Sequence, residues 1–269
     1  MNITDIIPAD MLTAEILTWN EEENIARTLS RLGWLEKIII IDSGSTDKTI
    51  ELVQSFPNTE IHTRKFDTHA TQWNYGLNFC NSKWVLSLDA DYILPDAFIE
   101  EVQQNILKTG MEAFYANFDF VVMGKALRGN NTTPRAVLFK KEYCSYYDDG
   151  HTQRLLINGR AESFTNKILH DDRKPLTRWL YNQGQYSQKE VIMLLQRSDK
   201  ELPFTGKLRK KKILAPVFIF FYCLLYKKMM FNGWRGWHYT LQRTLAEILI
   251  SLRLTEAAYL NKEEKDVNK

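Results

Sequence analysis

The sequence predicts an α/β protein, with a sheet that is flanked by helices and followed by a helical extension. Apolar segments with the length of strands alternate with helical patterns through residues 12–100. This alternation implies right-handed crossovers and a parallel sheet. Residues 111–162 carry strand patterns in succession, so the sheet becomes mixed in its second half. A basic, aromatic-rich region begins near residue 205 and reads as helical.

The first part of the chain alternates strands with helices. The segment "KIIIID" has the pattern of a strand buried on both faces, and "SGSTDKTIELVQSF" after it reads as a helix. We expect Ser45 or Thr46 to cap this helix, with Asp47 in its first turn. The expected elements are a strand over 12–19, a helix over 22–32, a strand over 37–42, the capped helix, a short strand over 60–63, a helix over 71–80, a strand over 84–88 and a helix from Pro95.

Strand patterns dominate the next part. Residues 111–124 alternate apolar and polar side chains like an antiparallel or mixed-sheet strand, and 135–141 continue the pattern. Residues 154–162 resemble a hairpin with Asn158 and Gly159 as its turn. A helix is then expected over 175–200, because Pro175 suits a first helical turn.

Length and composition are those of a globular protein. The chain has 269 residues, of which 44% are hydrophobic and 25% charged, so it can bury a sizeable core. Cys80, Cys144 and Cys223 form no CxxC pair, which argues against a disulfide framework or a zinc site and suits a reducing compartment. The opening "MNITDIIPADML" lacks a basic start followed by an apolar run, so we expect no secretory signal.

Charge divides the chain into two expected domains, residues 1–204 and 205–269. The first carries an acidic excess and the second a basic one, although the net charge is only +2. The apolar run 213–226 is shorter than the ~20 residues that span a bilayer. Lysines and arginines flank it, and Trp234 and Trp237 follow, which favours an interfacial or re-entrant segment. The alternative is a buried core helix with solvated basic ends.

The predicted strand ends are polar, and two of them are acidic. Residues 18–21 read "TWNE", 42–45 read "DSGS" and 89–91 read "DAD". Because the carboxyl ends of parallel strands meet at one edge, these side chains should gather there. Oxygen ligands favour Mg²⁺ or Mn²⁺, which could in turn hold a diphosphate. The plainer interpretation is that Asp89 or Asp91 caps the helix after Pro95, but one carboxylate would be enough for that.

Phosphate-binding patterns rich in glycine are absent. The sequence contains neither GxGxxG nor GxxxxGK[ST], so neither a dinucleotide fingerprint nor a P-loop is supported.

Four stretches together resemble the family 2 glycosyltransferases of the GT-A fold. "LTWNEEENIARTLSRL", "IIIIDSGSTDKTIELVQSF", "TQWNYGL" and "VLSLDADYILP" occur in the order and at the spacing of that family, over residues 12–100. More loosely, "PRAVLFKK", "DGHTQRLL", "ILHDDRKPLTRW" and "FNGWRGWHYTLQRT" are similar to a bacterial branch that makes lipopolysaccharide core or exopolysaccharide.

The resemblance implies roles for particular residues. Asp42 would accept a hydrogen bond from the nucleotide base, Asp89 would lie near the ribose and the metal's waters, and Asp91 would bind Mg²⁺ or Mn²⁺ directly. A late histidine completes the metal shell in many such enzymes, which here would be His170; its alternative is a purely structural role. The implied donor-binding residues are Thr18, Asn20, Glu22, Asp42, Ser43, Gln72, Asn74 and Asp89.

The catalytic base is less clear from the sequence. The family inverts the anomeric centre by direct displacement, which needs a carboxylate on the acceptor side. Relatives of the lipopolysaccharide-core type carry His-Glu where this chain has His151 and Thr152, so the acid is missing there. Asp149 is the candidate base, with Asp148 and His151 behind it, and a solvated acidic loop is the alternative. Arg178 and Trp179 match part of the processive QxxRW motif, but Pro175 replaces its glutamine, which favours a single addition.

These patterns and the resemblance together predict an inverting, metal-dependent glycosyltransferase. Its donor would be a nucleotide-sugar, with uracil suited to Asp42, and its acceptor a glycan or a lipid-linked saccharide. It would bind the anionic cytoplasmic face of a bacterial inner membrane and no nucleic acid. Two rivals are a sugar-phosphate nucleotidyltransferase, which usually shows a glycine-rich basic segment after its first strand, and a membrane-docked scaffold that lost catalysis.

Overall fold

The computed structural model describes residues 6–129, 133–149 and 152–267, which form two compact units. The first unit contains residues 6–126 and 133–174, and the second contains 127–129 and 175–267. The sequence places a boundary between 204 and 205, whereas the compact units divide after Lys174, because the helix that follows packs with the C-terminal helices.

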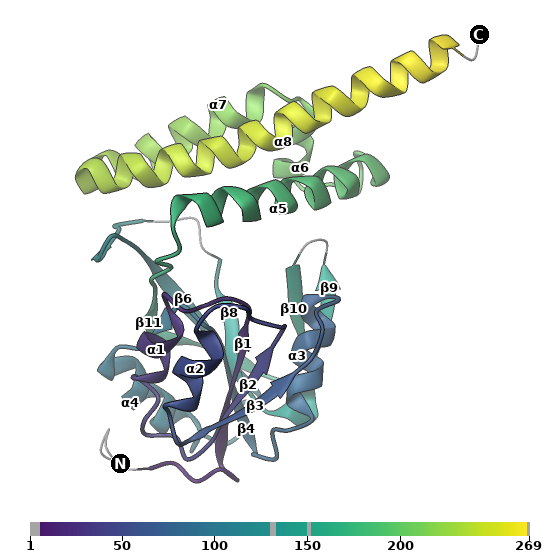
Figure 1. Cartoon of the computed structure of the whole chain (residues 1–269). Coiled ribbons are helices and arrows are strands. Elements are labelled where there is room, and N and C mark those ends of the chain that lie inside the picture. The colour runs from purple at the N-terminus through teal and green to yellow at the C-terminus, as the bar shows by residue number, and fades with distance from the viewer. Residues whose placement is uncertain (1–5, 130–132, 150–151, 268–269) are drawn as a thin grey trace. The chain divides into compact units, whose positions relative to one another are not determined.

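A mixed sheet forms the centre of the first unit (Figure 1). Its strand order is β3-β2-β1-β4-β8-β6-β11-β5, with β7 paired to β6. Strands β3, β2, β1 and β4 are parallel, β8 is antiparallel to both β4 and β6, and β11 is parallel to β6. The strands are β1 (Leu12–Thr18), β2 (Ile38–Asp42), β3 (Thr59–Thr63), β4 (Trp84–Asp89), β5 (Tyr92–Ile93), β6 (Ala113–Val122), β7 (Lys125–Ala126), β8 (Arg135–Phe139) and β11 (Ala161–His170).

Helices cover both faces of this sheet. Successive side chains of a strand point to opposite faces, so Ile38 and Ile40 join one buried cluster while Ile39 and Ile41 join the other. The first cluster includes Ile25 of α1 and the second includes Trp73 of α3. The helices are α1 (Ile25–Leu29), α2 (Thr49–Gln54), α3 (His69–Leu77) and α4 (Asp96–Asn105), with a short 3₁₀ turn over Lys141–Tyr143.

Two local predictions are wrong. Neither Ser45 nor Thr46 caps a helix, because the Ser45 hydroxyl bonds Asp42 and the helix starts only at Thr49. Residues 154–162 are not a hairpin either: β10 (Thr152–Ile157) pairs with β9 (Cys144–Asp149), whereas β11 joins the large sheet beside β6. The turn at Gly159, where the backbone closes against Glu112, therefore leads from one sheet to another.

The second unit is helical. It contains α5 (Leu176–Gln196), α6 (Phe204–Lys210), α7 (Leu214–Phe221), a π-helical turn over Tyr222–Tyr226, a 3₁₀ turn over Met229–Asn232 and α8 (Gly233–Val267). Its buried apolar cluster joins Val191 and Leu194 of α5 to Ile250 and Leu254 of α8. Among the described residues no single helix has the length and apolarity of a membrane span, but Leu214–Tyr226 and Met229–Leu260, bent by 64°, pass that test as a pair.

Candidate active site

The carboxyl ends of β1 and β2 meet at Asp42, as the sequence predicts. Thr18 donates to Asp42 Oδ1 at 2.9 Å, and the Ser45 hydroxyl donates to the same oxygen at 2.5 Å. The backbone N–H groups of Gly44 and Ser45 donate to Oδ2, both at 2.8 Å. A carboxylate offers about four acceptor positions, so a base that bonds Asp42 would have to displace one of these partners.

The neighbouring loops hold one another in place. Asn20 has a positive φ of 54°, donates its N–H to Ser45 Oγ at 2.8 Å and accepts from the Thr46 N–H at 2.7 Å. Glu22, which is exposed, accepts from the N–H of Lys48. The β1–α1 loop and the β2–α2 loop are therefore fixed to each other before any ligand arrives.

Two residues predicted to bind the donor, both on α3, have partners of their own. Gln72 is fully buried and donates to Ser43 Oγ at 3.1 Å, which ties α3 to the Asp42 loop. The amide of Asn74 donates to the backbone oxygen of Tyr146 and accepts from its N–H, at 2.8 and 3.0 Å. Asn74 thus holds β9 beside α3, and a donor contact by Asn74 stays a prediction.

Asp89 lies at the end of β4 and faces a cavity. Its Oδ2 accepts from Arg135 Nη1 at 3.0 Å, and the side chain is about one-third exposed. The cavity measures about 430 Å³ and is bordered by β4, β8, α3 and the β9–β10 hairpin. Among the residues predicted to bind the donor, Asp89 alone lines it.

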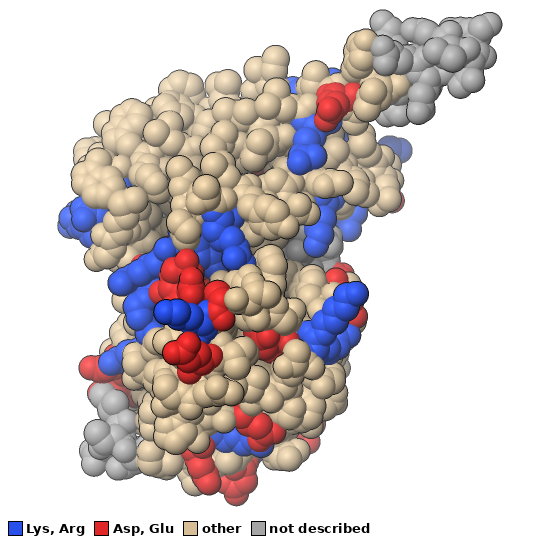
Figure 2. Space-filling model, viewed as in Figure 1, with Lys and Arg blue, Asp and Glu red and all other residues tan. Residues whose placement is uncertain are grey.

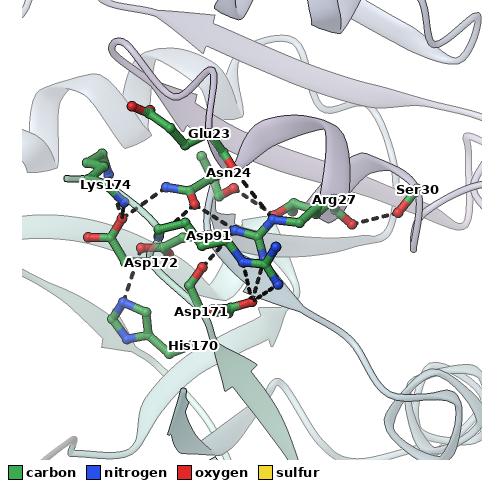
Figure 3. A network of polar contacts seen from close by, with 12 residues as sticks. Glu23, Asn24, Arg27, Ser30, Asp91, His170, Asp171, Asp172 and Lys174 are labelled. Carbon is green, nitrogen blue, oxygen red and sulfur yellow. Dashed lines mark hydrogen bonds and ion pairs between the residues drawn. The ribbon is translucent and has the colours of Figure 1, made fainter. Parts of the chain in front are cut away.

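Asp91 is buried beside His170 (Figure 3). Oδ2 of Asp91 lies 3.1 Å from His170 Nε2, because β11 pairs with β5 so that His170 stands opposite Tyr92. Burial favours the neutral carboxyl, but the charge and hydrogen bond of His170 outweigh it and lower the pKa of Asp91 to about 2. Its other oxygen, Oδ1, is buried and has no hydrogen-bond partner among the described residues.

An ionised, buried carboxylate with an open oxygen fits a divalent cation. Such an oxygen is costly unless something coordinates it, and hard oxygen ligands suit Mg²⁺ or Mn²⁺. His170 Nε2 is also close enough to share an ion with Asp91. The residues present therefore fit the metal that the resemblance implies.

A second group of carboxylates is better explained as loop structure. Oxygens of Glu22, Glu23 and Asp47 lie within 4.8 Å of one another, and both glutamates are exposed. Asp47 accepts from the N–H groups of Glu22 and Thr49, so it closes the two loops. We assign no ligand to this group.

A polar network that sequence reasoning missed supports Asp91 and His170 (Figure 3). Asn24 is fully buried; its amide donates to Glu21 and Asp172 and accepts from Arg27. Arg27 pairs with Asp171 at 2.6 Å, and the Asp171 N–H donates to the backbone oxygen of Asp91 at 3.0 Å. The network thereby joins the β1–α1 loop to the chain after His170. The only sequence signal was the density of charged and amide residues in 21–27 and 171–174.

Lys174 completes this network and is not a free cation. It forms a 2.8 Å ion pair with Glu21 and lies 3.5 Å from Asp172. Burial raises the pKa of Glu21 to about 7, although Lys174 acts in the opposite direction. The side chains of Lys174 and Glu21 are mostly shielded from solvent, so each charge is stabilised chiefly by the other.

The predicted base cannot be placed from the structure. His151 and the side chain of Asp149 lie outside the described residues. The β9–β10 hairpin, whose first strand ends at Asp149, borders the Asp89 cavity through Tyr146, Gln153 and Leu155. Asp149 and His151 therefore stay predictions.

Comparison with known proteins agrees with the fold. The family described as "Glycosyl transferase family 2" matches residues 14–172, more than half of the chain. An uncharacterized glycosyltransferase of Rickettsia bellii is 23% identical over 168 residues, 58% of this chain and 56% of that protein. The lipopolysaccharide core biosynthesis glycosyltransferase LpsC of Rhizobium meliloti is 34% identical over 99 residues, 35% of this chain and 37% of its own.

These matches thus span about half or less of the relatives' lengths. The S. aureus TarS structure superposes with a TM-score of 0.50 at 12% identity, covering 90% of this chain and 54% of TarS, which shows a shared fold. The predicted α/β fold class is confirmed. By its family match, this chain belongs to the family 2 glycosyltransferases.

Proposed function

We propose that the chain is an inverting, metal-dependent glycosyltransferase that moves one sugar from a nucleotide-sugar, with UDP favoured, to a glycan acceptor. The observation that carries this proposal is Asp91 in the loop after β4, whose buried, ionised carboxylate lies beside His170 and leaves Oδ1 without a partner among the described residues. An open carboxylate oxygen at the carboxyl edge of a parallel sheet is where a nucleotide diphosphate with its cation would be held.

The residues of this chain would divide the work as follows. The loop around Asp42 holds the nucleoside, and Gln72 fixes that loop through Ser43. Asp91 and His170 hold the metal, which neutralises charge on the departing diphosphate when bound. Asp149, on the hairpin beside the cavity, takes the proton from the acceptor hydroxyl.

The acceptor is proposed to be a lipid-linked saccharide or a lipopolysaccharide or exopolysaccharide chain. LpsC is named for lipopolysaccharide core biosynthesis, and it is the more identical of the two relatives described above. Addition of a single sugar is proposed because Pro175 stands where processive relatives have glutamine.

The second unit is proposed to bind the cytoplasmic face of a bacterial inner membrane. Large apolar side chains are exposed on it, among them Ile213 at 75%, Tyr226 at 72% and Phe231 at 71%. Figure 2 shows few charged side chains over α7 and over the part of α8 whose side chains are described. Lysines at 210–212 and 227–228 flank the apolar segment, and each basic residue near an anionic leaflet contributes roughly 1 kcal/mol.

The experiment that tests the activity is thermal unfolding with UDP, GDP, CDP and dTDP, each with and without Mn²⁺. A ligand at about 100 times its Kd stabilises by about 2.7 kcal/mol. We expect one diphosphate to raise the melting temperature only with Mn²⁺, and Asp91→Asn to abolish the shift. Asp10→Asn is the matched control, because Asp10 is an exposed carboxylate just before the first residue of β1, at the end of the strand away from the site. This variant should keep the shift in melting temperature. A shift that survives Asp91→Asn would remove the metal assignment.

A further inference from the structure

The cavity beside Asp89 is lined by residues to which the proposed donor and metal sites give no role. Its volume of about 430 Å³ lies within the usual range for small-molecule sites. Trp73 and Tyr146 are buried and stack on each other with ring centroids 5.5 Å apart, so they form the wall of the cavity, and the half-buried Tyr115 also borders it. A tyrosine ring of this kind suits the C–H face of a sugar and does not suit a diphosphate.

Arg135 contributes an unusual charge to this cavity. Only its Nη1 has hydrogen-bond partners among the described residues, namely Asp89 Oδ2 at 3.0 Å and the Tyr92 hydroxyl at 3.4 Å. The guanidinium has five N–H donors, so Nε and Nη2 keep three of them open. The side chain is 46% exposed, which leaves these donors accessible.

The open edge of Arg135 has a definite chemical preference. Nε and Nη2 lie side by side in the plane of the guanidinium and match the two oxygens of a carboxylate or phosphate. The ion pair with Asp89 holds the opposite side of the group and fixes its orientation.

We propose that this cavity binds a sugar that carries a carboxylate or a phosphate, and that Arg135 is the specificity-determining residue that binds the anionic group through Nε and Nη2. The sugar packs against the ring of Tyr115, and its hydroxyls meet Asp89 and Gln153. This inference rests on the proposed function, which supplies the two sugars of the reaction. The anionic sugar is either the acceptor or the sugar part of the donor, and the experiment separates these two sources.

The test is the measurement of dissociation constants for matched anionic and neutral ligands by ligand-observed NMR and calorimetry. Methyl glucuronide and glucose 6-phosphate are compared with methyl glucoside and glucose as acceptor-like probes. UDP-glucuronate is compared with UDP-glucose, both with Mn²⁺, as donor-like probes. We expect at least a tenfold preference for the anionic ligand in one of the two sets, and that set identifies the source.

Variants connect the preference to Arg135. Arg135→Gln should remove the preference, and Arg135→Lys, which keeps the charge but loses the paired donors, should retain only a small part of it. Arg160→Gln, an exposed arginine outside the cavity, is the control with the same change of charge. Thermal unfolding shows whether each variant folds, and if Arg135→Gln does not, Arg135→Lys alone decides.

Three outcomes would overturn the proposal: no preference in either set, a preference that survives in Arg135→Gln and Arg135→Lys, or no sugar binding at all. Binding of UDP with Mn²⁺ reports separately on the proposed function, because UDP carries no transferable sugar and Asp89 alone among the predicted donor-binding residues lines the cavity. A negative result for Arg135 therefore does not contradict the proposed donor site. Absence of UDP binding, in contrast, contradicts the proposed function itself.

Discussion

Asp91 Oδ2 and His170 Nε2 lie 3.1 Å apart and join the loop after β4 to the end of β11. The two residues are 79 positions apart in the chain. Tyr92 and Phe120 pack edge-on against the His170 ring and fix its orientation. A histidine held in this way can either ligate an ion directly or orient the carboxylate that does.

His170→Gln is expected to raise the Mn²⁺ concentration needed for nucleotide-dependent stabilisation by about 10–100-fold, as loss of a ligand or an orienting partner does. The midpoint of a Mn²⁺ titration at fixed UDP, followed by calorimetry, measures this. His62→Gln is the control, since His62 lies on the edge strand β3 and pairs with Glu60. An unchanged midpoint in His170→Gln would mean that the histidine serves packing alone.

Glu15→Gln is expected to be more stable than the wild-type protein, by a margin that grows as the pH rises. Glu15 is buried in β1 without a partner for either oxygen among the described residues, and a Cβ on Gly76 would collide with it. Burial raises its pKa well above the ordinary 4.5, with Lys141 opposing. Above about pH 4.5 the unfolded chain releases the Glu15 proton, whereas the folded protein retains it. The free energy of unfolding of the wild-type protein therefore falls as the pH rises, and that of Glu15→Gln does not show this loss.

Denaturant unfolding of wild type and Glu15→Gln between pH 4 and 8 measures this effect. The two curves should meet near pH 4, and the variant should be more stable by about 1 kcal/mol or more at pH 8, since one pKa unit corresponds to 1.36 kcal/mol. Glu51→Gln, an exposed glutamate on α2, should show no such trend. Parallel pH profiles for wild type and Glu15→Gln would contradict the raised pKa.

Asn24→Asp is expected to destabilise the first unit by about 1–3 kcal/mol. The substitution keeps the shape but removes the donor that serves Glu21 and Asp172, and it places a third carboxylate between theirs. Urea unfolding of the variant measures the loss. Asn81→Asp, at an exposed position before β4, is the control for the added charge. Equal stability of both variants would mean that the network of Figure 3 does not hold the two segments together.

Arg209→Met is expected to destabilise the second unit by about 3–5 kcal/mol, because it removes a cation that bonds two buried carboxylates. Arg209 bonds Glu190 of α5 and Glu247 of α8, both at 2.6 Å, and both glutamates are nearly inaccessible. Lys210→Met is the control: Lys210 pairs with the exposed Asp199, and its loss should cost less than about 1 kcal/mol. Equal losses in the two variants would contradict this account of the second unit.

Replacing Phe231 and Trp234 together by serine is expected to weaken binding to anionic vesicles at least tenfold, since burial of each large apolar side chain contributes about 1.5–3 kcal/mol. Both are exposed, at 71% and 55%. Cosedimentation with phosphatidylglycerol-containing vesicles measures the change, and vesicles of phosphatidylcholine alone should bind weakly. Leu107→Ser, 62% exposed on the first unit, is the control. If the double variant binds like wild type, the second unit does not dock through this segment.

Much of the first unit could be predicted from local patterns. Apolar runs predict the strands at 12–18, 38–42 and 84–89. Because these strands are parallel and adjacent, Thr18, Asp42 and Asp89 lie at one edge of the sheet. The prediction of a hairpin at 154–162 was wrong because Asn158 and Gly159 indicate a turn but do not determine which strands pair on either side of it. Strand pairing depends on contacts with distant segments, which here are β9 for β10 and β6 for β11.

The amino-acid sequence alone predicts the order of strands and helices, the acidic strand ends and the family to which they are similar, because these depend on periodicity and on residues close together in the chain. By contrast, the three-dimensional structure was needed to show that Asn24 binds Asp172, that Arg27 binds Asp171 and that Arg135 pairs with Asp89 at a cavity. These contacts join residues 46 to 148 positions apart, and no local pattern encodes which distant charges a folded sheet brings together.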